Sequence, residues 1–302
     1  MKIVFLGSIE FSKVVLEKLN EKYEVVCVVS QPNRVKKKGV FLDTPTAKFA
    51  KDNNILLHQP EHIKESVEFL KGLNADVLVS AAYGQYVPSK VLNLFKKTIN
   101  VHGSLLPKYR GGAPIQRSIM AGDTVTGITL IRMEKALDGG VMYAKRELEI
   151  DPNEDADSLF NRLAYLGADL LLENIEDIYN EKNLGEVQDE SLATYAPNIE
   201  KEEELIDFNN TSKDIINKIR GLSTNPGAYF AYKDTVIKVF KASEVTGING
   251  KVGEILKTKG GIVIKTLDSA ISLDMVLPAG KKLMDGKSFA NGQKLFVVGE
   301  SI

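Results

Sequence analysis

The 302-residue chain contains one cysteine, no tryptophan and only three histidines. A single cysteine excludes an internal disulfide and a zinc site made of several cysteines, and it fits a reducing compartment. No apolar run approaches the roughly eighteen residues that mark a membrane span, and the apolar start that ends at Gly7 is too short for the core of a signal peptide. We therefore expect a cytoplasmic protein without a membrane partner.

Two common nucleotide-binding motifs are also missing. The segment Gly7–Ser12, after the first apolar run, has a single glycine where a dinucleotide fingerprint requires a glycine triplet. No glycine-rich loop anywhere in the sequence ends in the Lys-Ser/Thr pair of a Walker motif. The motifs therefore indicate neither NAD nor ATP.

The net charge of the whole chain is only −1, but acidic and basic residues are distributed unevenly along it. From Asp207 to the C-terminus there are 14 basic and 9 acidic residues, a local excess of +5. The preceding 206 residues hold 25 basic and 31 acidic residues, or −6. The basic C-terminal part is either a lysine-rich solvated surface or a surface that binds phosphates.

What is present is the alternation of apolar runs and amphipathic stretches that is typical of a parallel sheet with crossover helices. The length favours two domains, and we expect the first to span residues 1–182. Its predicted strands lie at 3–6, 25–29, 55–57, 77–80, 99–102, 127–133 and 142–150. Its predicted helices lie at 11–19, 46–52, 63–73 and 157–179, and a further helix begins at Pro114. This pattern predicts a doubly wound α/β domain with a mostly parallel, Rossmann-like sheet.

The remainder of the chain follows a different pattern. Residues 183–206 are polar and poorly periodic, which predicts a linker, and residues 207–302 form the expected second domain. A helix at 212–222 with Ser212 as its cap should precede a series of short strands separated by turns such as Asp285-Gly286. These strands are predicted at 229–232, 236–240, 253–256, 262–266, 271–276 and 295–298. A small β-barrel, with an OB-type barrel among the candidates, is the expected fold.

The most informative histidine is His102, at the end of the strand predicted at 99–102. Asn100 and His102 are two residues apart, so their side chains project from the same face of the strand toward the crevice where ligands bind in such sheets. An amide donor beside an imidazole can stabilise an oxyanion, which is what acyl transfer requires. A purely structural role is equally compatible with this pair alone. His58 and His62, which flank Pro60, are expected to be structural.

Two glycine-containing segments follow this strand. Lys108–Pro114 is a glycine-rich loop that leads into a helix, and such a loop allows either a simple turn or the close approach of a flat ligand. Asp138 precedes Gly139 and Gly140 in a turn between two predicted strands. A carboxylate there could orient an imidazole and relay a proton, although a lone Asp-Gly is usually only a turn.

The combined order of these motifs resembles the folate-dependent formyltransferases that use 10-formyltetrahydrofolate. The elements of the resemblance are Asn100-x-His102-x-Ser104-Leu105-Leu106-Pro107, the glycine-rich loop, Gly127-Ile128-Thr129 and Asp138-x-Gly140. Residues 101–117 resemble the branch of this family that formylates methionyl-tRNA in particular. So do Gln31-Pro32-Asn33-Arg34, Tyr195-Ala196 and Pro278-Ala279-Gly280-Lys281-Lys282, and together these matches span essentially the whole chain.

The resemblance implies that Asn100, His102 and Asp138 are a catalytic trio, that the formyl donor is 10-formyltetrahydrofolate and that no metal is required. The α-amine of initiator methionyl-tRNA would be the acceptor, giving N-formylmethionyl-tRNA. The residues expected to border the folate are Ala82, Tyr83, Gly84, Gln85, Tyr86, Ser104, Leu105, Leu106, Pro107 and Gly140.

The resemblance also implies that the basic loop after the second strand enters the acceptor arm of tRNA, while the basic C-terminal barrel holds phosphates. Relatives often carry a more glycine- and proline-rich loop, so single lysines cannot be aligned there. The residues expected to contact tRNA are Arg34, Lys36, Lys37, Lys38, Lys281 and Lys282. We expect the protein to be a monomer.

Two other functions remain compatible with the sequence at this stage. One is a formyltransferase whose acceptor is an amino sugar nucleotide, and the other is an RNA-binding protein that has lost its chemistry. The presence of Asn100, His102 and Asp138 together argues against the second.

Overall fold

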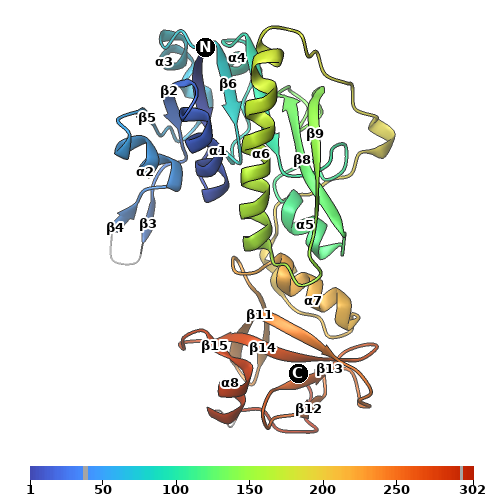
Figure 1. Cartoon of the computed structure of the whole chain (residues 1–302). Helices are drawn as coiled ribbons and strands as arrows, with labels where there is room; N and C mark the ends of the chain where they lie inside the picture. Colours follow the sequence, from blue (N-terminus) through green and yellow to red (C-terminus); the bar gives the residue numbers. More distant parts are fainter. Residues whose placement is uncertain (37–39, 293–294) are drawn as a thin grey trace. The chain divides into compact units, whose positions relative to one another are not determined.

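A computed structural model describes residues 1–36, 40–292 and 295–302, and the chain divides into two compact units (Figure 1). The first unit comprises Met1–Pro114, Val125–Glu149 and Phe160–Pro197. The second comprises Ile115–Thr124, Ile150–Leu159 and Asn198–Ile302. Two short segments that precede Asn198 in the sequence thus belong to the second unit. No helix among these described residues is long and apolar enough to cross a membrane.

The first unit is built on a seven-stranded sheet with the strand order β5-β2-β1-β6-β7-β8-β9. Its strands are β1 (Lys2–Leu6), β2 (Glu24–Val29), β5 (Leu56–His58), β6 (Val77–Ser80), β7 (Lys97–His102), β8 (Val125–Arg132) and β9 (Met142–Glu149). The five strands from β5 to β7 are parallel, whereas β8 and β9 are antiparallel to their neighbours. The predicted doubly wound, mostly parallel sheet is confirmed.

Helices cover the sheet because its central strands are apolar on both faces. Ile3, Val4, Phe5 and Leu6 of β1 are all fully buried, as expected for a strand with helices on either side (Figure 1). The helices that belong wholly or partly to this unit are α1 (Glu10–Asn20), α2 (Pro45–Asp52), α3 (Val67–Gly72), α4 (Ser89–Leu92), α5 (Pro114–Met120) and α6 (Ala156–Tyr179). Two 3-10 helices also occur, η1 (Ile63–Glu65) and η2 (Glu190–Leu192).

The predicted single helix over 63–73 is wrong, because it is interrupted at Ser66. The chain forms η1, leaves helical geometry at Ser66 and resumes as α3. The buried Ser66 hydroxyl contacts His58 Nε2 at 2.8 Å. His58 therefore has the structural contact that the sequence suggested for it.

A short hairpin follows β2 where the sequence predicted only a basic loop. It consists of β3 (Arg34–Lys36) and β4 (Val40–Leu42), which pair antiparallel with Arg34 opposite Leu42. The hairpin leads directly into α2. Its N-cap Thr44 accepts a hydrogen bond from the Ala47 backbone N–H, and Pro45 is the first helical residue.

The second unit contains a curled antiparallel sheet in the order β10-β11-β14-β13-β12, with β15 paired to β14. Its elements are η3 (Lys201–Glu204), α7 (Ser212–Gly221), β10 (Ala228–Tyr232), β11 (Thr235–Val245), β12 (Ile255–Lys257), β13 (Val263–Lys265), β14 (Ala270–Pro278), β15 (Met284–Asp285) and α8 (Gly286–Gly292). Apolar side chains from the sheet, α7 and α8 form one core, in which Phe230 is nearly fully buried. The expected small barrel-like β domain is confirmed as a half-barrel.

Three details of this unit differ from the prediction. Thr211, not Ser212, caps α7, because its hydroxyl accepts the Asp214 backbone N–H. Asp285-Gly286 does not form a simple turn: Asp285 accepts from the Ser288 N–H at the start of α8. The strand predicted at 295–298 is absent, since Phe296 is buried by stacking on Tyr232, with ring centroids 4.9 Å apart, and not by strand pairing.

Candidate active site

The candidate site lies at the edge of the first unit's sheet where its parallel strands end. Strands β2 and β5 lie on one side of β1, and β6 and β7 lie on the other, so the direction of winding switches between β1 and β6. Ligands in doubly wound sheets bind outside the carboxyl ends of the strands at such a switch. The segments that follow β1, β6 and β7 are therefore brought to one edge.

His102, the last residue of β7, is held from both sides of its ring. It is buried, and its Nε2 lies 2.9 Å from the backbone oxygen of Tyr109. A carbonyl oxygen only accepts hydrogen bonds, so this contact places a proton on Nε2. Nδ1 then faces Asp138, with 3.7 Å between Nδ1 and Oδ2. This gap is longer than a hydrogen bond, so the two groups are neighbours that are not hydrogen-bonded to each other.

Asp138 reaches His102 because the loop between β8 and β9 doubles back over the sheet. Strand β8 ends at Arg132, which pairs with Ile99, three residues short of His102. The loop rejoins the strands where the Arg132 N–H donates to the Val141 oxygen. At its tip, Asp138 has a left-handed backbone with φ of +49°, and its carboxylate accepts the Gly111 N–H at 2.9 Å.

The base of this loop requires a glycine. A Cβ atom on Gly140 would lie 1.9 Å from the Arg132 carbonyl oxygen, which no side chain can do. The glycine therefore allows the close approach of two backbone segments that closes the loop behind Asp138.

Asn100 completes the predicted trio from within β7. Residues alternate along a strand, so Asn100 projects from the same face as His102 and one repeat earlier. It is partly exposed, and among the described residues none forms a hydrogen bond with its side chain. Its amide is thus available as a donor on the face of β7 that carries His102. The structure brings all three sequence-predicted residues to one region.

The predicted folate segment after β7, residues 104–107, is hydrogen-bonded to Thr129 of β8. The fully buried Thr129 hydroxyl donates to the Ser104 oxygen at 2.7 Å and accepts the Leu106 N–H at 3.1 Å. Ser104 itself donates to the Lys108 oxygen. Leu105 is partly exposed, Leu106 is buried, and the peptide bond from Leu106 to Pro107 is cis. The backbone of this segment is therefore fixed beside the trio.

The other predicted folate segment, 82–86, follows β6 at the switch point. Gln31, at the end of β2, donates to the Tyr83 oxygen at 3.1 Å and accepts from Gln85 at 3.3 Å. Ala82 and Gly84 have left-handed backbones, and Tyr86 is exposed. The Tyr83 hydroxyl is buried without a hydrogen-bond partner among the described residues, and burial raises the pKa of Tyr83 to about 12.

A cavity of about 420 Å³ lies in the same unit, and none of its lining residues belongs to segment 82–86 or 104–107. Thr98 is one of its lining residues, and it precedes Asn100 by two positions on β7, so both belong to the same face of the strand. Met133, at the start of the Asp138 loop, lines it as well, and its backbone oxygen accepts from the Thr98 hydroxyl at 3.3 Å. Phe95 and Tyr143 add aromatic surface to its wall.

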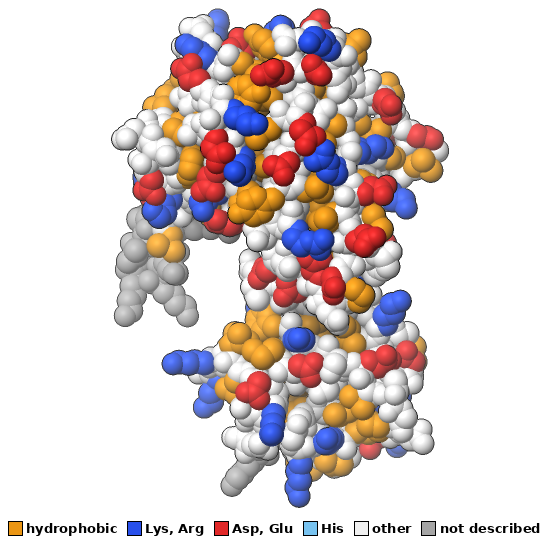
Figure 2. Space-filling view, in the orientation of Figure 1, with side chains coloured by type: hydrophobic (Ala, Val, Ile, Leu, Met, Phe, Trp, Pro, Cys, Tyr) orange, Lys and Arg blue, Asp and Glu red, His pale blue; other side chains and the backbone are white. Residues whose placement is uncertain are grey.

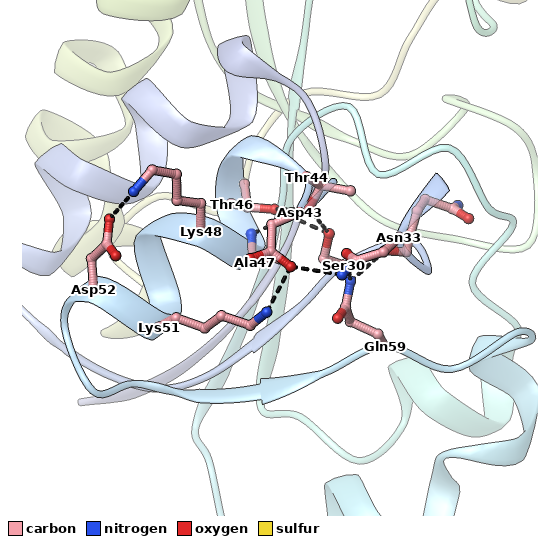
Figure 3. Close-up of polar contacts among 11 residues, drawn as sticks. Ser30, Asn33, Asp43, Thr44, Thr46, Ala47, Lys48, Lys51, Asp52 and Gln59 are labelled. Carbon is pink, nitrogen blue, oxygen red and sulfur yellow. Dashed lines mark hydrogen bonds and ion pairs between the residues drawn. The ribbon is translucent and has the colours of Figure 1, made fainter. Parts of the chain in front are cut away.

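The predicted tRNA loop can be described only in part. Arg34 and Lys36 lie on β3, whereas Lys37 and Lys38 lie outside the described residues. The base of the hairpin is formed by a polar cluster, which we call the hairpin base: Asn33, Asp43, Lys51 and Gln59 (Figure 3). Gln59 donates to the Gln31 and Asn33 oxygens, both at 2.8 Å.

Asp43 is the centre of the hairpin base. One of its oxygens accepts both the Asn33 amide and the Lys51 ammonium, each at 2.6 Å (Figure 3). The hydrogen bond from Lys51 is the largest cause that holds the pKa of Asp43 below its ordinary value. The carboxylate therefore joins the start of β3 to the end of β4 and to α2.

Lys281 and Lys282 lie in the second unit, in the turn between β14 and β15, and both are exposed. Figure 2 shows further basic side chains on the same unit, interspersed with acidic ones. The local excess of basic residues is thus distributed over its surface and includes this turn.

Sequence reasoning missed the contribution of the segment 183–206 to this site. The segment contains Gln188, whose buried amide contacts the Asp138 loop, and Thr194, which pairs with Tyr109. Its polar, poorly periodic composition is typical of a linker, so only the isolated Tyr195-Ala196 match pointed to it. No group of three His, Cys, Asp or Glu residues within the described part of the chain is arranged to hold a metal ion.

Comparison with known proteins identifies both units. Residues 1–175 match the formyl transferase family model, and residues 198–294 match the model of the formyl transferase C-terminal domain. The chain is 40% identical over 306 aligned positions to the methionyl-tRNA formyltransferase of Streptococcus pneumoniae (strain Hungary19A-6), and the alignment covers 99% of this chain and 98% of that protein.

Two crystal structures share the fold at lower identity. HypX from Aquifex aeolicus in complex with tetrahydrofolic acid has a TM-score of 0.69 and 19% identity, over 97% of this chain and 47% of HypX. WlaRD, a sugar 3N-formyl transferase in the presence of dTDP and 5-N-formyl-THF, has a TM-score of 0.68 and 22% identity, over 93% of this chain and 99% of that one.

Proposed function

Because the chain belongs to the methionyl-tRNA formyltransferases of the formyl transferase family, and is therefore an enzyme that formylates methionyl-tRNA, we propose that Asn100, His102 and Asp138 perform this transfer. The proposed donor is 10-formyltetrahydrofolate, and the proposed acceptor is initiator methionyl-tRNA. The observation that carries the assignment of the trio is the 3.7 Å between His102 Nδ1 and Asp138 Oδ2, with Asn100 two residues before His102 on the same face of β7. A carbonyl placed there meets two hydrogen-bond donors and one base.

The first role of the trio is to stabilise negative charge. When the neutral α-amine attacks the formyl carbon, a new C–N bond forms and charge develops on the formyl oxygen. The Asn100 amide donates to this oxygen, and so does Nδ1 in the form of the His102 ring that carries a proton on both nitrogens. Each such donor typically lowers the barrier by about 3 kcal/mol. The contact from Nε2 to Tyr109 prevents the ring from turning away.

The second role is proton transfer. The attacking nitrogen must lose a proton, and the folate nitrogen must gain one as its bond to the formyl carbon breaks. Asp138 accepts the first proton through a water molecule and returns it toward the leaving nitrogen, while its negative charge keeps the His102 ring oriented. The proton count balances, since one proton leaves the amine and one reaches the folate nitrogen.

The chain's own residues fit a folate donor. The cavity of about 420 Å³ is within the usual size range of small-molecule sites, and its aromatic wall suits a flat ring system. Because its lining includes Thr98 of β7, two residues before Asn100, we place the ring system of the donor there. The segments 82–86 and 104–107 have fixed backbones at the same strand edge, and we place them around the remainder of the donor.

We assign the tRNA to the hairpin of β3 and β4 and to the basic surface of the second unit. Phosphate groups are bound by Lys and Arg. The turn with Lys281 and Lys282 presents two such side chains, and no carboxylate of the described residues is bonded to either. We further propose that the protein acts as a monomer, that 1–182 carries the catalytic trio and that 207–302 binds tRNA. The segment 183–206 between them supports the catalytic site through Gln188 and Thr194.

A direct product assay tests this function. The purified protein is incubated with 10-formyltetrahydrofolate, initiator methionyl-tRNA and an amino sugar nucleotide in one reaction, and both acceptors are analysed by mass spectrometry. We expect a gain of one formyl group on the methionine of the tRNA and none on the sugar. Exclusive formylation of the sugar would replace the proposed acceptor, and formylation of neither would refute formyl transfer.

A further inference from the structure

The segment 188–196 contacts both groups that hold the His102 ring. On one side, Asp138 faces Nδ1 from the tip of a loop that lies outside the sheet and has a left-handed backbone. On the other side, the Tyr109 oxygen accepts from Nε2, and Tyr109 also has a left-handed backbone, with φ of +64°. Such conformations persist only where surrounding contacts fix them.

Gln188 fixes the Asp138 side. Its buried amide nitrogen donates to the backbone oxygens of Asp138, at 2.6 Å, and of Gly140, at 2.8 Å. One side chain thus holds the two carbonyls on either side of Gly139. The amide has only two N–H donors, and both are used on the loop that carries the carboxylate.

The oxygen of the same side chain is bound by Arg110. Arg110 Nε and Nη2 donate to Gln188 Oε1 at 3.1 and 2.8 Å, so Gln188 has no free hydrogen-bonding position. Arg110 is also buried, and its guanidinium makes two further hydrogen bonds to Glu190, at 2.9 and 2.7 Å. The orientation of the Gln188 amide is therefore determined, with the nitrogen toward Asp138.

The Tyr109 side is fixed by backbone pairing with 194–196. The Arg110 N–H donates to the Thr194 oxygen at 2.8 Å, and the Ala196 N–H donates to the Arg110 oxygen at 2.6 Å. The Tyr109 N–H also donates to the Thr194 hydroxyl at 2.9 Å. The same segment thus reaches His102 by two independent routes.

We propose that Gln188 is a positioning residue for formyl transfer, which sets the Asp138 carboxylate against the His102 ring through the carbonyls of Asp138 and Gly140. This inference rests on the proposed role of the trio. Gln188 does not touch the reacting atoms, so its loss should lower kcat and leave the KM for methionyl-tRNA nearly unchanged.

Gln188→Glu is the sharpest test, because it keeps the size of the side chain and the bonds to Arg110 but replaces the two N–H donors with an acceptor. We expect kcat to fall by about 10- to 100-fold, with a change of less than about twofold in the KM for methionyl-tRNA. Asn174→Asp is the matched control, since it removes an amide donor to a backbone oxygen in α6, away from the trio. It should leave kcat and KM within about twofold of the parent values.

Gln188→Ala serves as a second variant in which water can enter, and rates of all variants are divided by the folded fraction measured by circular dichroism. A kcat within twofold of the parent for a folded Gln188→Glu or Gln188→Ala protein would overturn the proposal, as would equal losses in kcat and in tRNA affinity. His102→Ala is measured alongside. If it retains full activity, the proposed trio fails; if it loses activity while the Gln188 variants do not, only the role of Gln188 fails.

Discussion

At the scale of single residues, the chemistry of the site depends on where a few polar groups are placed. His102 and Asp138 belong to different strand connections and meet because one loop doubles back along β7. The motifs singled out both residues, and the family resemblance implied their catalytic roles, which stay a prediction. It could not predict the contact from His102 Nε2 to Tyr109, because the left-handed conformation of Tyr109 is imposed by a segment some 85 positions away.

Cys27 gives a prediction at this scale. Its thiol is fully buried in β2, and burial raises its pKa from 9.0 to about 12. At pH 8 the folded protein should therefore contain about a thousandfold less thiolate than the unfolded chain. We expect iodoacetamide to leave Cys27 unmodified in the native protein and to alkylate it in denaturant, as followed by mass spectrometry.

The same shift predicts how stability changes with pH. Below pH 9 both states keep the proton, so the contribution of Cys27 to the free energy of unfolding is constant. As pH rises from 9 toward 12, the unfolded chain loses the proton first, and the native state is destabilised by up to about 1.4 kcal/mol for each pH unit. Urea titrations of the parent and of Cys27→Ala should diverge above pH 9; parallel pH profiles would contradict the shift.

At the scale of elements, most strands and helices of the first unit follow from the apolar pattern, since buried parallel strands must be apolar on both faces. The pattern failed where side-chain contacts decide the structure. The helix predicted over 63–73 is interrupted at Ser66, whose hydroxyl contacts His58. Phe296 does not belong to a strand, and its ring is buried against Tyr232. The linker composition likewise concealed Gln188, because its hydrogen bonds are all to residues distant in sequence.

The hairpin base gives the prediction for this scale. Asp43→Ala removes the acceptor that joins Asn33 and Lys51, so the hairpin should lose its fixed direction. We expect the KM for methionyl-tRNA to rise by roughly 3- to 10-fold, which corresponds to the net value of one or two hydrogen bonds. At saturating tRNA, kcat should stay within about twofold of the parent value.

Asp52→Ala is the matched control for this variant. It breaks the Lys48–Asp52 contact, which has the same distance of 2.6 Å but lies on the exposed face of α2, away from the hairpin base (Figure 3). Steady-state kinetics should show no change in the KM for tRNA. Equal effects of Asp43→Ala and Asp52→Ala would mean that the hairpin base does not position the hairpin.

At the scale of the whole molecule, the uneven distribution of charge is consistent with the proposed roles. The acidic N-terminal part carries the proposed catalytic trio, and the basic C-terminal part is proposed to bind tRNA. The C-terminal part has an excess of +5, and binding to tRNA phosphates should release counterions. We therefore expect the logarithm of the tRNA association constant to fall linearly with the logarithm of the salt concentration. Replacing Lys281 and Lys282 together by alanine should reduce this slope by roughly 1.5 to 2.

A second double variant separates phosphate contact from net charge. Lys64 and Lys71 are exposed lysines of the first unit that we do not assign to tRNA, and replacing both by alanine changes the net charge by the same amount. Filter-binding titrations over a range of salt should give this variant the parental slope. An affinity independent of salt in the parent protein would contradict the assigned surface.

The measurement that tests the account most directly is a double-mutant cycle on the single-turnover rate of formyl transfer, with His102→Ala, Asp138→Ala and the double variant. Each single replacement should lower the rate by on the order of 100-fold, with little change in tRNA affinity. Because the two groups act on one reacting carbonyl, the double variant should be little slower than the slower single variant. Losses that multiply in the double variant, or a single variant with the parental rate, would show that His102 and Asp138 do not act together.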